Sequence, residues 1–221
     1  MSCGSDLIDF TVKGPCLLGL FSPSSGGKTH TALELVRNRK LIFDTRPTKA
    51  YFVYANWQKA FSDLALKDPD VTFTTSIDSL NDPEVKDCLI VLDDQDLTTK
   101  GSKSQKVLKN FALRDSHHKS CVVIYMSHTL FHPALRLIQL QTQYLCVFRF
   151  ARDVSSVSYL ARQLAAGRTA FIVDAYRKAI ESREQGAYLF ININCKDSRA
   201  KFWLRNTILP SLDMLVFVPR D

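Results

Sequence analysis

The stretch that decides the fold is CLLGLFSPSSGGKTHT, residues 16–31. Its first six residues are apolar or small and lie between Gly-Pro at 14–15 and Ser-Pro at 22–23, which predicts a short buried strand. Small residues follow at once, and apolar residues at core spacing then predict a helix over 29–37. A strand, a small-residue loop and a helix in this order are the sequence form of a phosphate-binding loop.

The residues of this loop have chemistry that suits a polyphosphate. Gly26 and Gly27 have no Cβ, so the backbone can turn tightly and point N–H groups at phosphate, at the start of a helix. The Lys28 ammonium would reach the β- and γ-phosphates, and the Thr29 hydroxyl would bind the bridging Mg²⁺. The strict pattern has glycine where this chain has Ser22, a place that serine can hold if its φ is negative. The alternative is a surface turn that precedes a lysine by chance. The candidate residues for binding ATP are Ser22, Ser24, Ser25, Gly26, Gly27, Lys28 and Thr29.

A second candidate motif is CLIVL at 88–92, followed by Asp93 and Asp94. A continuous apolar run too short for a helix is typical of a buried parallel strand. At the carboxyl end of such a strand, Asp93 could hold Mg²⁺ together with Thr29, and Asp94 could orient and deprotonate an attacking water. The alternative is that two acidic residues merely begin a polar turn. An upstream phosphate loop favours the catalytic interpretation.

The other elements predict one α/β domain over residues 1–221, because 46% hydrophobic content suffices for one substantial core. Within it, residues 1–15 lead into the sheet with a strand at 7–12, and residues 151–221 complete the domain. Further strands are expected at 49–54, 71–75, 121–126, 144–150 and 187–192, and helices at 102–114, from 153 and after 167. A mainly parallel sheet flanked by helices, with an extra strand between the loop strand and the acidic-pair strand, indicates a P-loop NTPase of the RecA-like, additional-strand division.

Composition limits the cellular context. The six cysteines are scattered without paired metal spacing, which indicates reduced core residues of an intracellular protein. We see no signal peptide and no apolar run long enough to span a bilayer, so a soluble protein is expected. A net charge of +7 favours a polyanionic partner such as nucleic acid without establishing one.

Two sets of basic residues each have two possible interpretations. The lysines at 100, 103, 106 and 109 favour a solvated helix surface over a DNA contact. His128 and His132 are four residues apart, as in some zinc sites, but Pro133 and the strand-to-loop context argue against a shared helical face.

Five longer stretches resemble a known family. They are YANWQ (54–58), LIVLDDQ (89–95), SHHKSCVVIYMSHTLFH (116–132), ARDVSSVSYLARQ (151–163) and LRNTILP (204–210). Together they are similar to the packaging ATPases of large eukaryotic DNA viruses, and most to the small versions in adintoviruses and Maverick/Polinton elements, within the FtsK-HerA superfamily. The resemblance implies a ring-forming motor that uses ATP and Mg²⁺ to drive double-stranded DNA into a preformed capsid, with a capsid or portal protein as partner and no membrane. It also implies a location at the site of virus assembly, in the host nucleus or in the virion.

The resemblance carries over to particular residues. Lys28-Thr29 and Asp93-Asp94 match the family's phosphate-loop pair and acidic pair. Where relatives have Gln-Asn after the sensor strand, this chain has His128-Thr129, and His128 could still hydrogen-bond a γ-phosphate or the attacking water.

The resemblance also suggests an arginine that acts on the neighbouring subunit. Arg114 falls where related ATPases have a basic residue, so it is the first candidate for a finger that reaches the neighbour's γ-phosphate, and Arg152 is the second. The implied catalytic residues are therefore Asp94, His128 and Arg114.

Two other functions remain open from the sequence. One is a nucleotide-binding structural or DNA-associated protein with little turnover, against which the intact acidic pair argues. The other is a small P-loop kinase, which would need an arginine-bearing lid that we do not find in the sequence.

Overall fold

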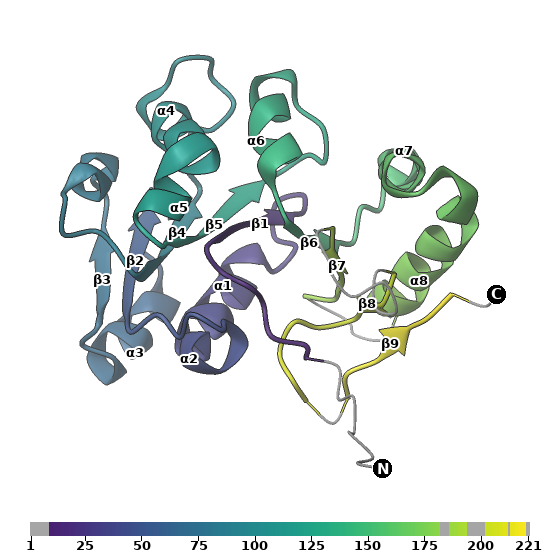
Figure 1. Cartoon of the computed structure of the whole chain (residues 1–221), viewed down its shortest axis with the longest axis horizontal. Helices are drawn as coiled ribbons and strands as arrows, with labels where there is room; N and C mark the ends of the chain where they lie inside the picture. The colour runs from purple at the N-terminus through teal and green to yellow at the C-terminus, as the bar shows by residue number, and fades with distance from the viewer. Residues whose placement is uncertain (1–8, 182–185, 194–201, 212, 220–221) are drawn as a thin grey trace, which may run out of the picture.

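The computed structural model describes residues 9–181, 186–193, 202–211 and 213–219, and shows one mixed sheet between two layers of helices (Figure 1). The strands are β1 (Cys16–Phe21), β2 (Lys49–Tyr54), β3 (Val71–Thr74), β4 (Cys88–Asp93), β5 (Val122–Ser127), β6 (Tyr144–Phe148), β7 (Tyr188–Asn192), β8 (Leu204–Arg205) and β9 (Val216–Phe217). Their order across the sheet is β3-β2-β4-β5-β1-β6-β7-β8-β9. Neighbouring strands from β3 to β6 in this order pair in parallel. The three remaining pairs, β6–β7, β7–β8 and β8–β9, are antiparallel.

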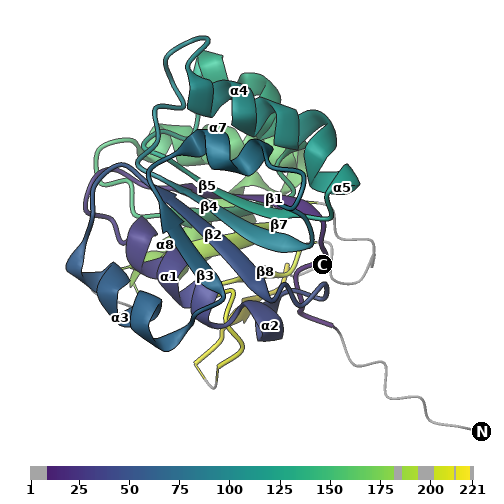
Figure 2. The ribbon, with the colours of Figure 1, turned by 90° about the vertical axis from the view of Figure 1, so that its left-hand side faces the viewer.

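The helices divide between the two faces of the sheet. They are α1 (Lys28–Arg37), α2 (Arg39–Ile42), α3 (Lys59–Lys67), α4 (Lys103–Asn110), α5 (Ser116–His118), α6 (Arg136–Gln141), α7 (Val154–Leu164) and α8 (Thr169–Glu181). Apolar residues of α4, α6, α7 and α8 form the core on one face, and those of α1, α2 and α3 form the core on the other. Figure 2 shows α4 and α7 on one side of the twisted sheet and α1, α2 and α3 on the opposite side.

The predicted architecture is confirmed. β5 lies between β1 and β4, as expected for the additional-strand arrangement. The central strands form as predicted because their apolar runs are buried on both faces, as the helices cover the sheet on each side. The helix predicted over 102–114 has Ser102 as its N-cap, and α4 continues into a π-helical turn over Phe111–Asp115.

The predicted N-terminal strand is wrong in its described part. Residues 7 and 8 lie outside the described residues, and the remainder makes a single bridge, from Val12 to Phe43. Asp9 explains why no ladder forms there, because its Oδ1 accepts hydrogen bonds from the backbone N and the hydroxyl of Thr11, at 2.9 and 2.7 Å. Such local bonds compete with strand pairing.

The ends of the chain add details that the sequence did not predict. β8 and β9 have two residues each, too few for a periodic pattern.

Four cysteines are buried and free, while Cys3 and Cys195 lie outside the described residues. In the described part of the chain, no helix combines the length and the apolar character that a membrane crossing requires.

Tyr176 fastens α8 to the end of β6, from which the next loop starts. It is 2% exposed, and its hydroxyl accepts from the Phe150 N–H at 2.8 Å and donates to the Phe148 carbonyl at 3.0 Å. Tyr176→Phe leaves both backbone groups without this partner, and we expect the free energy of unfolding to fall by about 1–3 kcal/mol. Urea denaturation measures the loss, with half-exposed Tyr159→Phe as the control. A loss no larger than that of the control would mean that the hydroxyl does not hold this junction.

Candidate active site

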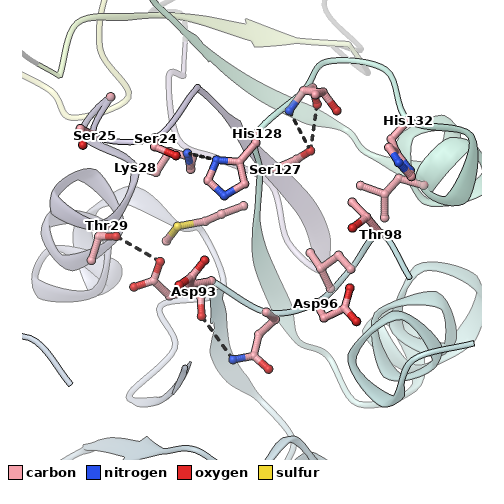
Figure 3. A pocket seen from close by; sticks show the side chains of 18 of the residues that line it. Ser24, Ser25, Lys28, Thr29, Asp93, Asp96, Thr98, Ser127, His128 and His132 are labelled. Carbon is pink, nitrogen blue, oxygen red and sulfur yellow. Dashed lines mark hydrogen bonds between the residues drawn. The ribbon is translucent and has the colours of Figure 1, made fainter. Parts of the chain in front are cut away.

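The carboxyl ends of β1, β4 and β5 meet at one edge of the sheet, where the loops that follow them enclose a pocket of about 750 Å³ (Figure 3). The phosphate-loop candidates Ser24 to Thr29 line it on one side, and residues 93–98 and 126–129 line it on the others. Parallel strands place successive loops at a common edge, so the two sequence motifs come together although they are more than sixty residues apart.

The two glycines are required by close approaches of other atoms. A Cβ on Gly26 would lie 1.6 Å from the Ser22 Oγ. A Cβ on Gly27 would lie 2.8 Å from the Gly186 Cα, and Gly27 also has a φ of 96°, which disfavours residues with side chains. Ser25 has a φ of 61°, whereas Ser22 is not among the described residues with positive φ. Ser22 therefore holds the glycine position without backbone strain, as the sequence required.

Lys28 lies under the loop and contacts it. Its side chain is largely buried, and Nζ donates hydrogen bonds to the carbonyls of Ser22 at 2.6 Å and Pro23 at 3.0 Å. Burial lowers the pKa of Lys28 to about 8, although the charges of Asp93 and Asp94 oppose this shift. A phosphate oxygen in the pocket would give this ammonium an anionic partner.

Thr29 and Asp93 lie together at the base of the pocket, where the Thr29 hydroxyl donates to the Asp93 Oδ1 at 3.1 Å. Burial raises the pKa of Asp93 to about 6, the Thr29 hydrogen bond opposes the shift, and the negative charge of Asp94 adds to it. Hydroxyl and carboxylate oxygens are ligands that Mg²⁺ prefers. A cation held by these two oxygens would favour the ionised carboxylate, so the donor set fits Mg²⁺.

Asp94 follows at the mouth of the pocket. It is exposed and has a φ of 52°, so the chain turns sharply as β4 ends. Gln95 secures this turn by donating from Nε2 to the Asp93 carbonyl at 3.2 Å, and its Oε1 accepts from the Ser104 hydroxyl at 3.0 Å. The sequence interpretation missed Gln95 and Ser104, although the position of Gln95 directly after the acidic pair could have indicated its role.

His128 lies beside the start of the loop, and Figure 3 shows its ring directed toward Lys28. The distance from the Lys28 Nζ to the His128 Nδ1 is 3.4 Å. Burial and the charge of Lys28 lower the pKa of His128, so the ring is neutral at neutral pH. Because an ammonium only donates, a hydrogen bond between the two groups would make Nδ1 the acceptor and leave the proton on Nε2. The Nε2–H is therefore the group that could donate to a ligand.

His132 does not join His128. In Figure 3 it lies near Thr98, on the far side of the pocket, and its Nδ1 accepts from the Ala134 N–H at 3.2 Å. Within the described ranges, no cluster of three or more His, Cys, Asp or Glu side chains is arranged to hold a metal ion.

The two candidate arginines lie outside the pocket. Arg114 is exposed in the π-helical turn after α4, which runs from the pocket edge back toward the start of β5. Eleven residues separate it from the start of α4, about 17 Å at 1.5 Å per residue. Arg152 is exposed in the loop after β6. Because β6 pairs in parallel with β1, Arg152 lies at the same sheet edge as the phosphate loop.

The strand order and the loop–helix junction define a P-loop NTPase fold. Solved structures with similar folds include the genome packaging NTPase B204 from Sulfolobus turreted icosahedral virus 2 in complex with AMPPCP, with a TM-score of 0.52 and 9% identity over 93% of this chain and 98% of that chain. The complex of the same protein with AMP has a TM-score of 0.52 and 9% identity over 96% of this chain and 100% of that chain. B204, the DNA-packaging ATPase from Sulfolobus Turreted Icosahedral Virus, has a TM-score of 0.50 and 9% identity over 93% of this chain and 98% of that chain. No family model and no curated protein matches the sequence.

The raised pKa of Asp93 predicts how stability depends on pH. The pKa rises from 3.8 to about 6 on folding, so the folded state binds this proton more tightly and loses stability as pH rises across that interval. A pKa difference of about two units corresponds to at most about 3 kcal/mol in the free energy of unfolding. Asp93→Asn should therefore unfold with a higher free energy than the wild type above pH 6, and the difference should vanish toward pH 4.

Urea denaturation at both pH values, with chelator and without nucleotide, measures this difference. Asp63→Asn is the matched control, because the Asp63 carboxylate is exposed on α3 and does not line the pocket. Equal pH profiles for wild type and Asp93→Asn would show that burial does not perturb this carboxyl.

Proposed function

We propose that the protein is an ATP-hydrolysing motor of the FtsK-HerA type, which moves double-stranded DNA into the capsid of a virus or virus-like element. One observation carries the nucleotide site. Lys28 and Asp93 are buried in the same pocket, and among the described residues they form no ion pair with each other. Both pKa values are shifted toward neutrality. A ligand that carries both an anion and a cation, such as MgATP, would stabilise both charges at once.

Five side chains of the pocket have a role in this mechanism. The N–H groups of the loop and the start of α1 would hold the phosphates, and Lys28 would exchange its carbonyl contacts for phosphate oxygens. Thr29 and Asp93 would hold Mg²⁺, which supplies charge neutralisation when bound. Asp94 would accept the proton of the attacking water, and the His128 Nε2–H would donate to the γ-phosphate.

Three observations support the DNA and capsid parts of the proposal. The sequence resemblance points to packaging ATPases, and the fold is shared with solved structures named as a genome packaging NTPase and a DNA-packaging ATPase. The net charge of +7 suits DNA, which a translocating motor must grip by its phosphates. A capsid or portal protein is the second proposed partner, and the adintovirus-like lineage is part of the proposal.

The pocket favours a motor over the two alternatives. A nucleotide binder without turnover could use Asp93 to hold Mg²⁺, but it has no need for the second carboxylate of Asp94 in the same pocket. A small kinase covers the phosphates with lid arginines, but no arginine lies among the described residues that line this pocket. In the proposed homo-oligomeric ring, an arginine from a neighbouring copy would complete the site.

ATP hydrolysis with and without double-stranded DNA tests the function. We expect DNA to raise the rate, and the effect to weaken steeply between low and moderate salt because phosphate contacts release counterions. Lys28→Ala should abolish turnover, and Asp94→Asn should slow it by about 10²- to 10⁴-fold while MgATP still binds. Lys40→Ala is the control, because Lys40 is exposed on α2. Binding without turnover would instead favour the structural alternative, and turnover that ignores DNA would favour the kinase.

Mixed variants test an arginine that acts between subunits. Arg114→Ala and Arg152→Ala each keep an intact loop, whereas Lys28→Ala keeps both arginines. If one arginine acts across an interface, its variant should lose about 10³- to 10⁵-fold in rate, and mixing with Lys28→Ala should restore part of the activity.

The assembly state of each mixture is the control, measured by sedimentation. Rescue with Arg152→Ala only would assign the finger to the pocket edge, and rescue with Arg114→Ala only would assign it to the far end of α4. No rescue with either variant, in assembled mixtures, would contradict a finger at both positions.

A further inference from the structure

The short helix α6 lies on the face of the sheet that α4 and α7 also cover (Figure 1). A groove lies on each side of this helix. The groove toward α7 has a volume of about 690 Å³ and includes Leu130, Phe131 and Tyr159 in its lining. The groove toward α4 has a volume of about 750 Å³ and includes Lys100 and Lys109. Arg136 and Leu140 line both grooves, and Leu137 lines the second. We call Arg136, Leu137 and Leu140 the α6 ridge.

The ridge exposes apolar side chains beside recessed apolar surface. Leu140 is 74% exposed and Leu137 is 42% exposed, and half-exposed Tyr159 packs edge-on against Phe131 across the first groove. Single exposed leucines are common on soluble proteins. Two of them on one turn, next to grooves with apolar lining, form the kind of contiguous patch that marks a contact surface.

The charge of this surface has one sign. Lys100, Lys109 and Arg136 line the grooves, and no Asp or Glu does so in the part of the chain that the structure describes. None of these three cations forms an ion pair with another described residue. An occupant that brings carboxylates would therefore meet available cations.

We infer that the α6 ridge and its two grooves dock a helical segment of a partner protein that carries leucine-like side chains along one stripe and carboxylates beside it. Apolar side chains would enter the grooves on either side of Leu140, and the carboxylates would pair with Lys100, Lys109 and Arg136. A DNA backbone would match the cations but would leave the leucines without a partner, because they offer no hydrogen bond to phosphate.

The segment 128–135 connects this surface to the nucleotide pocket. His128 approaches Lys28 at its start, Leu130 and Phe131 line the first groove, and His132 lines the pocket and both grooves. The segment is fixed to the helices on both sides. Gln139 of α6 donates to the Leu130 carbonyl at 2.9 Å, and Gln105 of α4 donates to the Ala134 carbonyl at 2.9 Å. A partner on the ridge would thus contact the segment that carries His128, although docking itself does not depend on hydrolysis.

Peptide binding to the full chain tests the inference. The probe is a fluorescent synthetic helix of about 18 residues with leucines at helical spacing and glutamates beside them. Two matched peptides replace its glutamates by lysine or its leucines by serine. We expect anisotropy titrations to show binding of the first peptide only, and the Leu137→Ser/Leu140→Ser double variant and Arg136→Glu should each weaken it by at least about tenfold.

Leu66→Ser is the control variant, since Leu66 is 85% exposed on α3 and remote from the grooves. Its affinity should equal that of the wild type, and unchanged thermal unfolding would show that all variants fold. Failure of the acidic peptide to bind, or equal binding by the double variant, would overturn the inference. Loss of affinity for a short DNA duplex in Arg136→Glu, with no binding of the acidic peptide to the wild type, would reassign the surface to nucleic acid. A changed sedimentation coefficient of the double variant without peptide would reassign it to a contact between copies of this chain.

Discussion

The parallel pairing of β1 with β5 is the constraint on which the site depends. Phe21 is in register with Ser127, and the Ser22 N–H donates to the Ser127 carbonyl at 3.1 Å, directly where both strands end. This register places the start of the phosphate loop beside the start of the segment that carries His128. Both strands are buried along their whole length, so a slip by one residue would exchange the faces of an entire strand and disturb the packing on both sides of the sheet.

The loop geometry follows from this arrangement. The chain must turn from β1 into α1 within a few residues, and the Ser22 side chain occupies the space beside Gly26. Glycine at 26 is then required by contact, whereas glycine at 27 is required by both contact and its left-handed backbone. The serine at 22 and the glycine at 26 therefore form a complementary pair, in which the side chain of one uses the space that the other leaves.

The charges of the pocket are held in a state that favours a ligand. Lys28 is stabilised by backbone carbonyls and Asp93 by one hydroxyl, and both groups are buried. Their pKa values show that each charge is only partly compensated. The folded protein thus has lower stability than a neutral pocket would allow, which is the usual consequence of organising an active site before its ligand binds. The segment 128–135 connects this site to the surface beside α6. His128 at its start approaches Lys28, and Ala134 near its end accepts a hydrogen bond from Gln105 of α4.

The sequence by itself determined the central strands, the phosphate loop and the acidic pair, because each is a local pattern of apolar runs, small residues and charges. It also predicted an extra strand between the loop strand and the acidic-pair strand, and the structure shows that this strand is β5. It failed at residues 9–12, where a short Asp–Thr hydrogen-bond network replaces strand pairing, and at β8 and β9, which are too short to have a period. Only the tertiary structure decided which groups share the pocket. Gln95 lines it and is bonded by Ser104 from outside, Gly186 approaches the loop at Gly27, and Arg114 and Arg152 lie outside the pocket. Burial and distance between remote residues depend on how the strands pack and not on any local pattern.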